Sequence, residues 1–515
     1  MNGAESLINA LAEHGVDACF ANPGTSEMQL VAALDKQPGI RAVLCLFEGV
    51  VTGAADGYGR MADKPALTLL HLGPGFANGI ANLHNAQRAR SPILNMVGDH
   101  ATEHLKHDAP LTSDIEGLAT PVSRTFQVSE SADRLAQTGL DALAASLHYP
   151  GSISTFVVPA DHAWTDIAPP SYQLPETPTV SVADDAITEI GSQLKAADNS
   201  CLFLGGHALR AEALHHAGRI AAATGCRLVT ETFFARQARG VGRVATERLA
   251  YFGEAAIEQL AGIDLMVLVG AKAPVSFFAY PNKPSVLAPQ SATELTLADA
   301  ESDALDALTR LADHLDAQDH PVVISESAQY PLGEGRIDAS ELGKVIANRL
   351  PENAIVCDEG ATNSLGAFLL TANAAPHDWL TLTGGAIGQG LPLALGAAIA
   401  CPDQKVIALE ADGSGMYTVQ ALWTMVREQL DIAVVLLNNR SYAILNIELS
   451  RVGVEQPGTT ALSLLDLSNP DLEWTNIARG MGMQAIKVGT VAELDQAFAA
   501  TIENTGPYLI EVIIK

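Results

Sequence analysis

Acidic and amide side chains follow two apolar runs in the last third of the chain. The run Val406–Leu409 leads to Asp412, and the run Ala433–Leu437 leads to Asn439. The segment between them is long enough for one helix, so we predict two neighbouring parallel strands whose polar ends meet at one edge of a sheet. A carboxylate, an amide oxygen and a nearby backbone carbonyl form a partial shell for Mg²⁺, which phosphate oxygens and water complete.

The residues next to Asp412 indicate a diphosphate. Gly413 and Gly415 allow backbone N–H groups to approach a phosphate closely, and Ser414 offers a hydroxyl between them. An ordinary Asp-Gly turn would have the same letters. The pattern alone therefore leaves both interpretations open.

A single carboxylate interrupts an apolar run near the N-terminus. Glu48 lies within Leu44–Val51, which we predict to be a strand, and the glycine-rich segment Gly53–Arg60 that follows predicts a tightly packed helix. A carboxylate among apolar residues needs a hydrogen bond or a proton. Glu48 is therefore a candidate catalytic acid, or else a residue that stabilises the N-terminus of the helix.

Three blocks position these residues: 1–165, 183–315 and 336–515. In each block short apolar runs alternate with helical patterns, which predicts an α/β fold of three consecutive domains with mainly parallel sheets. Proline-bearing and polar stretches, Ala168–Pro178 and Asp316–Gly335, are predicted linkers. The predicted strands are Asp17–Ala21, Ala42–Phe47, Ala66–His71, Ile93–Val97 and Ser154–Val158 in the first block, Cys201–Leu204, Arg227–Thr230 and Leu265–Val269 in the second, and Ala354–Cys357, Val406–Leu409, Ala433–Leu437 and Tyr508–Ile514 in the third.

Composition excludes several classes of protein. The net charge of −29 disfavours binding to nucleic acid, and 48% hydrophobic residues provide for a large core. We find no apolar run of about 18 residues and no signal peptide, so we expect no membrane partner. The six cysteines form no CxxC pair, which predicts buried free thiols and a cytoplasmic location.

Five ordered motifs resemble those of thiamin-diphosphate-dependent enzymes, in particular the acetolactate synthase and benzoylformate decarboxylase group. The motifs span Ala21–Glu27, Phe47–Arg60, Leu72–Asn78, Asp358–Thr362 with Thr383–Pro392, and Asp412–Asn439. One position departs from the pattern, because Ala411 replaces the first glycine of the family's Gly-Asp-Gly. The resemblance implies that the three blocks are the pyrimidine-binding, central and diphosphate-binding domains.

The resemblance also implies a role for each matching residue. Glu48 would contact N1′ of the aminopyrimidine, the carbonyl of Gly385 would accept a hydrogen bond from the 4′-amino group, and Ile387 would hold the cofactor in its bent shape. Asp412, Asn439 and the backbone carbonyl of Ser441 would bind Mg²⁺. The other expected cofactor contacts are Asn22, Pro23, Gly24, Thr362, Gly413, Ser414 and Ile444. The family further implies a homo-oligomer, with Glu48 and the diphosphate site contributed by different subunits.

The substrate-handling positions combine features of several relatives. His71 and Thr25 match positions at which benzoylformate decarboxylase has an active-site histidine and serine, so we assign both as candidate catalytic residues. The arginine with which acetolactate synthases clamp an acceptor is replaced by Ser276. Glu448 lies near the position of their tryptophan, and Asp99 replaces a glutamine. We find no FAD signature in the second block and expect no FAD.

These features predict decarboxylation of a small 2-oxo acid to a C2-bound enamine, followed by carboligation or protonation. The first alternative is a simple decarboxylase of the benzoylformate type that yields an aldehyde. Further alternatives are a 2-hydroxyacyl thioester lyase and a non-catalytic subunit with the same fold. The loss of the arginine clamp favours a neutral carbonyl acceptor over a second 2-oxo acid.

Overall fold

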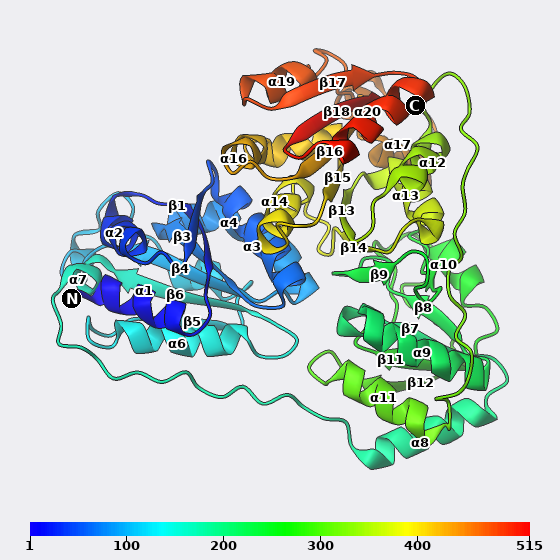
Figure 1. The fold of residues 1–515 in the computed structure, drawn as a ribbon, viewed down its shortest axis with the longest axis horizontal. Coiled ribbons are helices and arrows are strands. Elements are labelled where there is room, and N and C mark those ends of the chain that lie inside the picture. Colours follow the sequence, from blue (N-terminus) through cyan, green and yellow to red (C-terminus); the bar gives the residue numbers. More distant parts are fainter. Residues whose placement is uncertain (515) are drawn as a thin grey trace.

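The computed structural model describes residues 1–514 and contains three mainly parallel sheets, one after another along the chain. In Figure 1 the first sheet and its helices lie on the left, the second at the lower right and the third at the upper right. A long segment without helices or strands connects the first part to the second. The α/β fold class with mainly parallel sheets is as predicted.

The first sheet has six parallel strands in the order β2-β1-β3-β4-β6-β5. Its strands are β1 (Ala18–Asn22), β2 (Arg41–Leu44), β3 (Ala66–His71), β4 (Ile93–Asp99), β5 (Thr125–Val128) and β6 (Ile153–Pro159). Its helices are α1 (Gly3–Glu13), α2 (Met28–Lys36), α3 (Glu48–Ala62), α4 (Leu72–Ala89), α5 (Ile115–Ala119), α6 (Leu135–Ser146) and α7 (Ala160–Trp164), with short 3₁₀ turns η1 (Thr25–Glu27) and η2 (Leu105–His107). Helices on both faces bury the central strands, which explains their unbroken apolar runs.

The second sheet has the strand order β10-β8-β7-β11-β12, again parallel. Its strands are β7 (Ser200–Leu204), β8 (Arg227–Thr230), β10 (Glu247–Arg248), β11 (Leu265–Val269) and β12 (Thr293–Ala298), and its helices are α8 (Asp184–Ala196), η3 (Gly206–Leu209), α9 (Ala211–Thr224), α10 (Gly253–Gln259) and α11 (Ala304–His314).

The third sheet has the order β17-β18-β16-β15-β13-β14-β9. Its strands are β9 (Gln237–Arg239), β13 (Ala354–Glu359), β14 (His377–Thr381), β15 (Val406–Ala411), β16 (Ile432–Asn438), β17 (Gln484–Val488) and β18 (Tyr508–Ile513). Its helices are α12 (Ala339–Arg349), η4 (Ala361–Asn363), α13 (Leu365–Leu370), η5 (Thr371–Asn373), α14 (Gly390–Ala400), α15 (Asp412–Gly415), η6 (Met416–Thr418), α16 (Ala421–Arg427), α17 (Ala443–Arg451), α18 (Thr459–Ser463), α19 (Trp474–Gly480) and α20 (Val491–Glu503). The strand β9 is antiparallel to β14 and belongs in sequence to the second block, so it joins the two blocks.

Helices α3 and α14 cross closely and join the first block to the third. A Cβ at Gly57 of α3 would lie 2.0 Å from the carbonyl oxygen of Leu393, and one at Gly396 of α14 would lie 1.8 Å from that of Ala54. Small residues on both helices are therefore required for this approach. The glycine-rich segment after Glu48 forms the predicted packed helix for this reason.

Several predictions about individual elements need correction. The segment Leu44–Val51 is not a strand, because β2 ends at Leu44 and Glu48 is the first residue of α3. The strands β5, β9, β10, β12, β14 and β17 were not predicted. Most of them are short or lie near a sheet edge, where one face contacts polar surroundings and the continuous apolar run is lost.

Two further sequence predictions concern the cysteines and the membrane. All six cysteines are free thiols, five of them buried and Cys401 half-buried, as predicted. Within residues 1–514, no helix combines the length and the apolar character needed to cross a membrane.

Candidate active site

Glu48 lies in the first turn of α3 with its side chain almost fully buried. Its exposed fraction is 8%, and Nδ2 of Asn78 donates a hydrogen bond of 3.0 Å to its Oε2. Asn78 comes from α4, the helix that packs beside α3. The hydrogen bond from Asn78 therefore fixes the position of a buried carboxyl.

His71 is the last residue of β3 and lies beside a second buried carboxyl. Its Nδ1 is 2.7 Å from Oε2 of Glu27, which is fully buried. Oε2 of Glu27 also accepts a hydrogen bond from the backbone N–H of Gly24 (2.7 Å), and its Oε1 accepts one from the hydroxyl of Ser26 (2.7 Å). Nδ1 faces Glu27, and no hydrogen bond within residues 1–514 engages the other ring nitrogen of His71.

Thr25 lies beside this pair on an exposed turn. It is the first residue of η1, whereas Glu27 is the last residue of the same turn and is buried. Asn22 ends β1, and Pro23 and Gly24 continue from it, all three half-buried. The predicted cofactor contacts Asn22, Pro23 and Gly24 therefore lie at the carboxyl edge of the first sheet, near His71.

Three turns at the predicted site contain non-glycine residues in the left-handed conformation. Leu72 follows β3 with φ of +49°, Ala361 follows β13 with φ of +49°, and Arg440 follows β16 with φ of +58°. Such residues cost of order 1 kcal/mol or more each and concentrate at functional sites. Each directly precedes or follows a predicted site residue: His71, Thr362 or Asn439.

Asp412 and Asn439 lie at the carboxyl ends of the neighbouring parallel strands β15 and β16. Oδ1 of Asp412 accepts a hydrogen bond from the N–H of Gly413 (2.9 Å), and Oδ2 accepts one from the N–H of Arg440 (2.7 Å). Oδ1 of Asn439 accepts one from the N–H of Ser441 (3.0 Å). These hydrogen bonds hold the turns in place. Oxygen atoms that are suitable metal ligands thus lie at the ends of both strands.

The environment of Asp412 fits a cation. Burial raises its pKa to about 6, and its hydrogen bonds come from backbone N–H groups rather than from a basic side chain. A bound divalent cation would favour the ionised form, since an opposite charge offsets the cost of desolvation. No three histidine, cysteine, aspartate or glutamate side chains of residues 1–514 come together as a metal site. This donor set therefore needs phosphate oxygens and water to complete the shell of a metal.

Ser414 contacts a pair of buried glutamates behind the glycine-rich turn. Its hydroxyl donates to Oε1 of Glu410 (2.7 Å), and Glu410 is paired in register with Glu359 on β13. Burial raises the pKa of Glu359 to about 7 and raises that of Glu410 further, because the first carboxylate disfavours charge on the second. The other expected phosphate contact, Thr362, is half-buried in η4, three residues after the end of β13.

Glu359 also holds the loop that carries Gly385 and Ile387. Its Oε1 accepts a hydrogen bond from the N–H of Gly388 (2.7 Å), and its Oε2 accepts one from the N–H of Gly390. Gly385 has φ of +75°, and a Cβ there would lie 2.8 Å from the ring of Phe277. Glycine is therefore required, and the residue is exposed. Ile387 is half-buried on the same loop, as a wedge residue would be.

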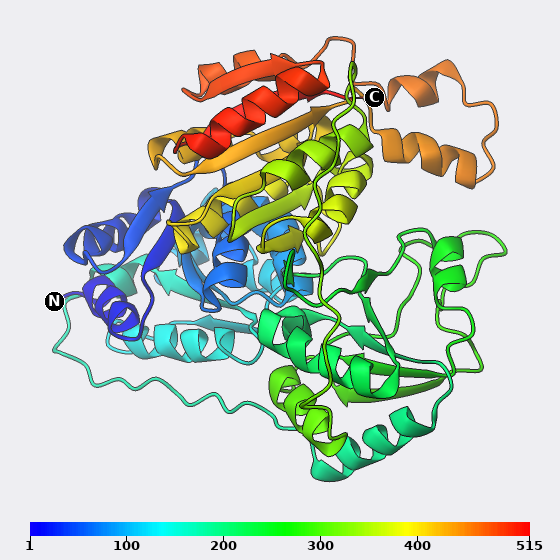
Figure 2. The same cartoon turned by 45° about the vertical axis from the view of Figure 1, so that its right-hand side comes forward.

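Helix α17 and an aromatic cluster of the second block form a wall near Gly385. Figure 2 shows α17 and α18 projecting beyond the third sheet. The ring of Phe277 packs against those of Phe233 (5.5 Å), Tyr251 (5.6 Å) and Phe278 (4.9 Å). Ile444 lies half-buried in the first turn of α17. The cluster gives this part of the surface a largely aromatic character.

The residues at which the sequence departs from its relatives have defined environments. Glu448, on α17, accepts a hydrogen bond from the hydroxyl of Tyr280 in the second block. Ser276 is half-buried and donates its hydroxyl to the carbonyl of Pro284 (3.0 Å), so it is engaged within its own loop. Burial raises the pKa of Asp99, which ends β4 beside His71 in the sheet.

The candidate residues form two groups within one chain. The pairs Glu48–Asn78 and His71–Glu27 lie in the first block, whereas Asp412, bonded to the N–H of Arg440, and Asn439, bonded to that of Ser441, lie in the third. Among residues 1–514, no hydrogen bond joins a member of one group to a member of the other. The loop Thr383–Gly390 touches both blocks, because Asn85 of α4 donates to the carbonyl of Ala386 (2.7 Å).

Comparison with known proteins decides the family. A model described as the N-terminal TPP-binding domain of thiamine pyrophosphate enzymes matches residues 1–118, and one described as the C-terminal TPP-binding domain matches residues 358–512. A Mycobacterium tuberculosis protein, provisionally named acetolactate synthase large subunit IlvX, is 48% identical over 100% of this chain and 99% of its own. The chain belongs to the thiamine pyrophosphate enzyme family. Thiamine pyrophosphate and thiamin diphosphate are the same cofactor.

More distant members of this family carry two different names. The large subunit of acetolactate synthase isozyme 2 of Escherichia coli is 26% identical over 100% of this chain and 96% of its own. Benzoylformate decarboxylase of Pseudomonas aeruginosa is 27% identical over 98% and 97%. The thiamin-diphosphate-dependent 4-hydroxybenzoylformate decarboxylase of Rhodococcus jostii shares the fold, with a TM-score of 0.86 at 22% identity over 100% and 99% of the two chains. This protein is thus a thiamin-diphosphate-dependent enzyme of the acetolactate synthase and benzoylformate decarboxylase family.

Sequence reasoning did not single out Asn78, Glu27, Glu359 or Glu410 as site residues. Two of them end motifs that the sequence analysis quoted, Ala21–Glu27 and Leu72–Asn78, so a signal was present. Glu410 offered another signal, because a carboxylate stands in the otherwise apolar strand β15. Its partner Glu359 lies inside the motif Asp358–Thr362, but that the two glutamates face each other follows only from the pairing of β13 with β15.

Proposed function

We propose that this enzyme uses thiamin diphosphate and Mg²⁺ to remove the carboxylate of a small 2-oxo acid as CO₂. The remaining fragment is then ligated to a second carbonyl compound or protonated to an aldehyde. The cofactor supplies the electron sink for decarboxylation. The observation that carries this proposal is the set of oxygen donors of Asp412, Asn439 and Ser441 at the ends of β15 and β16, in a chain of this family.

In this proposal Glu48 holds or releases the proton at N1′ of the cofactor, and Asn78 keeps its carboxyl in place. The carbonyl of Gly385 accepts a hydrogen bond from the 4′-amino group, and Ile387 supports the ring system. The proposed cofactor contacts are Asn22, Pro23, Gly24, Thr362, Gly413, Ser414 and Ile444. Asp412, Asn439 and the Ser441 carbonyl would hold Mg²⁺, which would neutralise charge on the cofactor's diphosphate.

His71 favours protonation as one outcome of the second step. Its free ring nitrogen can deliver a proton while Glu27 fixes the ring, and Thr25 lies exposed beside it. The hydroxyl of Ser276 cannot replace an arginine clamp for a carboxylate. We therefore propose that any acceptor is an aldehyde or another neutral carbonyl. Simple decarboxylation to an aldehyde is the second candidate function, and the His71–Glu27 pair favours it.

We further propose that the active site forms between two copies of the chain. The two groups of residues, around Glu48 and around Asp412, share no hydrogen bond within one chain, so a second copy would bring them together. The working unit would then be a homo-oligomer whose blocks 1–165, 183–315 and 336–515 serve as the pyrimidine-binding, central and diphosphate-binding domains.

Release of CO₂ from a panel of 2-oxo acids, including pyruvate and benzoylformate, tests the reaction class. With thiamin diphosphate and Mg²⁺ present, we expect release from at least one member, and we expect Glu48→Gln to abolish it. Analysis of the products then separates aldehyde from ligation product. No release from any member, with cofactor binding verified, would contradict the proposal and favour a 2-hydroxyacyl thioester lyase or a non-catalytic subunit.

A further inference from the structure

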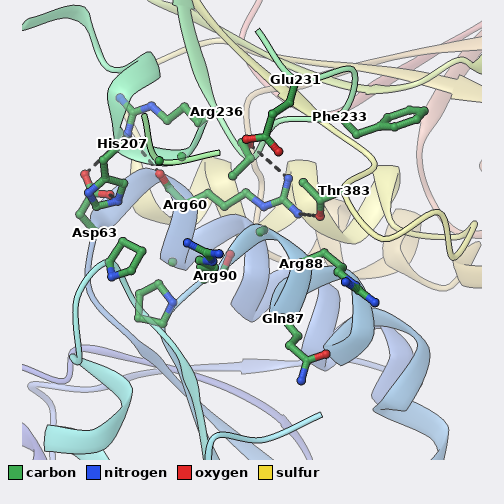
Figure 3. A pocket seen from close by; sticks show the side chains of 18 of the residues that line it. Arg60, Asp63, Gln87, Arg88, Arg90, His207, Glu231, Phe233, Arg236 and Thr383 are labelled. Atoms are coloured by element: carbon green, nitrogen blue, oxygen red, sulfur yellow. Dashed lines mark hydrogen bonds and ion pairs between the residues drawn. The ribbon is translucent and has the colours of Figure 1, made fainter. Parts of the chain in front are cut away.

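A cavity of about 350 Å³ lies where the three blocks meet, and none of the residues assigned above to catalysis, cofactor or metal lines it. The end of α4 and the segment after it, residues 87–92, line one side. The turns that follow β7, β8 and β11 line the other side, and Thr383 of the third block closes it. Figure 3 shows Arg88 and Arg90 on the first side and His207, Glu231 and Arg236 on the other. Its volume is within the range of small-molecule sites, at the lower end.

The cavity is basic in a strongly acidic protein. Its charged lining consists of Arg60, Arg88, Arg90, Arg210, Arg236 and Lys272, against the two carboxylates Asp63 and Glu231. Burial and the cation of Arg210 lower the pKa of His207 to about 4, so the histidine adds no charge at neutral pH. The net charge of the whole chain is −29. A local excess of cations within such a chain focuses a positive potential in the cavity.

Two of these cations each keep one donor that the protein does not use. Arg210 pairs with Asp63 (2.7 Å) and Arg236 with Asp378 (2.9 Å) through Nη2. Nη1 of Arg210 and Nε of Arg236 are nevertheless buried without a hydrogen-bond partner in residues 1–514. Arg60 is engaged with Asp56 and with the carbonyl of Thr381 (2.8 Å). Buried donors without a partner are costly, and an anion with several oxygens would satisfy them.

Glu231 restricts the size of such an anion. A Cβ at Gly205, the glycine after β7, would lie only 1.6 Å from Oε1 of Glu231. The carboxyl therefore occupies the space above the glycine turn between β7 and α9, where a nucleotide diphosphate would otherwise approach the backbone. A side chain in that position excludes a diphosphate from the glycine turn.

We propose that this cavity is a binding site for a compact oxyanion with at least two negative charges, such as a phosphate monoester or a polycarboxylate, and not for a dinucleotide. The ligand occupies the cavity lined by Arg90 and Lys272 and accepts hydrogen bonds from guanidinium groups of the lining, those of Arg210 and Arg236 among them. Because it contacts the first and second blocks together, it stabilises their arrangement. Phosphate and carboxylate share the geometry that an arginine fork recognises.

Binding is measured by calorimetry and thermal unfolding of the holoenzyme, saturated with thiamin diphosphate and Mg²⁺ so that its diphosphate site is filled. The probes are inorganic phosphate and citrate, which separate the two sources of oxyanion. We expect at least one to bind and to raise the unfolding temperature with concentration. In the double variant Arg90→Met/Lys272→Met the same probe should bind at least about tenfold more weakly. Neither residue contacts the proposed active site.

The matched control is Arg349→Met/Lys36→Met, which removes the same charge from two surface ion pairs, Arg349–Asp495 and Lys36–Glu5. This variant should bind the probe as the wild type does. Equal weakening in both variants would show a non-specific effect of charge and overturn the proposal. The absence of binding by either probe at millimolar concentration would also overturn it. So would FAD or ADP binding more tightly than both probes in a manner that depends on Arg90.

Discussion

Nδ1 of His71 lies 2.7 Å from Oε2 of Glu27, and Glu27 is fully enclosed by protein. A Cβ at Gly98 would lie 1.9 Å from Oε1 of the same carboxyl, so neither Glu27 nor its surroundings can move far. Carboxylate–imidazole pairs of this kind fix the tautomer and orientation of the ring. If His71 transfers a proton as proposed, Glu27 acts through it as a positioning residue.

Replacing Glu27 by Gln should lower kcat by about 10- to 100-fold with little change in KM, because proton transfer by a misoriented imidazole is inefficient. In the His71→Ala background the same replacement should have almost no further effect, since the two residues act as a unit. Steady-state kinetics of the four proteins checks this. Additive losses in the double variant would contradict it. Glu5→Gln, which affects a surface pair with Lys36, is the control.

Removal of divalent metal should release the cofactor. We expect that dialysis against a chelator lowers the affinity for thiamin diphosphate at least about tenfold, since the diphosphate and Asp412 share the cation. Added Mg²⁺ should restore it, and Asp412→Asn should require much more Mg²⁺ than the wild type. Titration of cofactor binding by fluorescence quenching measures both effects. Unchanged affinity in the presence of the chelator would exclude a metal bridge.

Arg451 connects α17 to the second block and should influence substrate binding. Its Nη2 lies 3.0 Å from Oε2 of Glu254, and its guanidinium lies over the rings of Phe252 (4.6 Å) and Tyr280 (4.8 Å). Arg451→Met should loosen the wall near Gly385 and raise KM by about three- to tenfold with a smaller change in kcat. Arg349→Met, which breaks a surface pair far from this wall, is the matched control. A pure loss of kcat in Arg451→Met would contradict a role in substrate binding.

Glu231 should make stability depend on pH. Burial raises its pKa to about 7, while Arg90 and the N–H of Gly206 oppose the shift. The folded state then binds more protons than the unfolded state between the ordinary pKa of glutamate and about 7, so this carboxyl lowers stability as pH rises through that window. The upper limit of this loss in the free energy of unfolding is about 3 kcal/mol. The actual loss is smaller, because the carboxyl borders a cavity.

The variant Glu231→Gln should therefore lose less stability than the wild type between pH 5 and about pH 8, a window set by the raised pKa. Denaturant unfolding at several pH values measures the difference, with Glu5→Gln as a control on an exposed carboxyl. Parallel stability curves for wild type and Glu231→Gln would show that Glu231 does not titrate in this range.

The sequence predicted the central strands well, because strands buried on both faces keep unbroken apolar runs, as β3 and β8 do with the predicted bounds. Glu48 shows the limit of this signal. The apolar residues before and after it form one run in the sequence. In the structure the chain passes at Cys45–Phe47 from a strand into a helix. The periodicity of so few residues does not distinguish a strand from a helix. The strand β9 was missed because its partner β14 lies more than a hundred residues away.

The chemistry of the site was predictable where one side chain and its neighbours in sequence carry it, as with Asp412 and Gly413. It was not predictable where the function depends on contacts across the fold. The pairing of His71 with Glu27 and that of Glu359 with Glu410 join separate strands and turns. Single-sequence patterns contain no information on such contacts unless the topology is already known.

We propose that one catalytic site unites Glu48 of one copy with Asp412 of another. Co-expression of Glu48→Gln and Asp412→Asn chains, each inactive alone, tests it by release of CO₂ from the best 2-oxo acid. In each mixed dimer one site carries both replacements and the other carries neither, so the mixture should regain about a quarter of the wild-type activity. Complete inactivity of verified mixed dimers would place both residues of a site in the same chain and contradict the account.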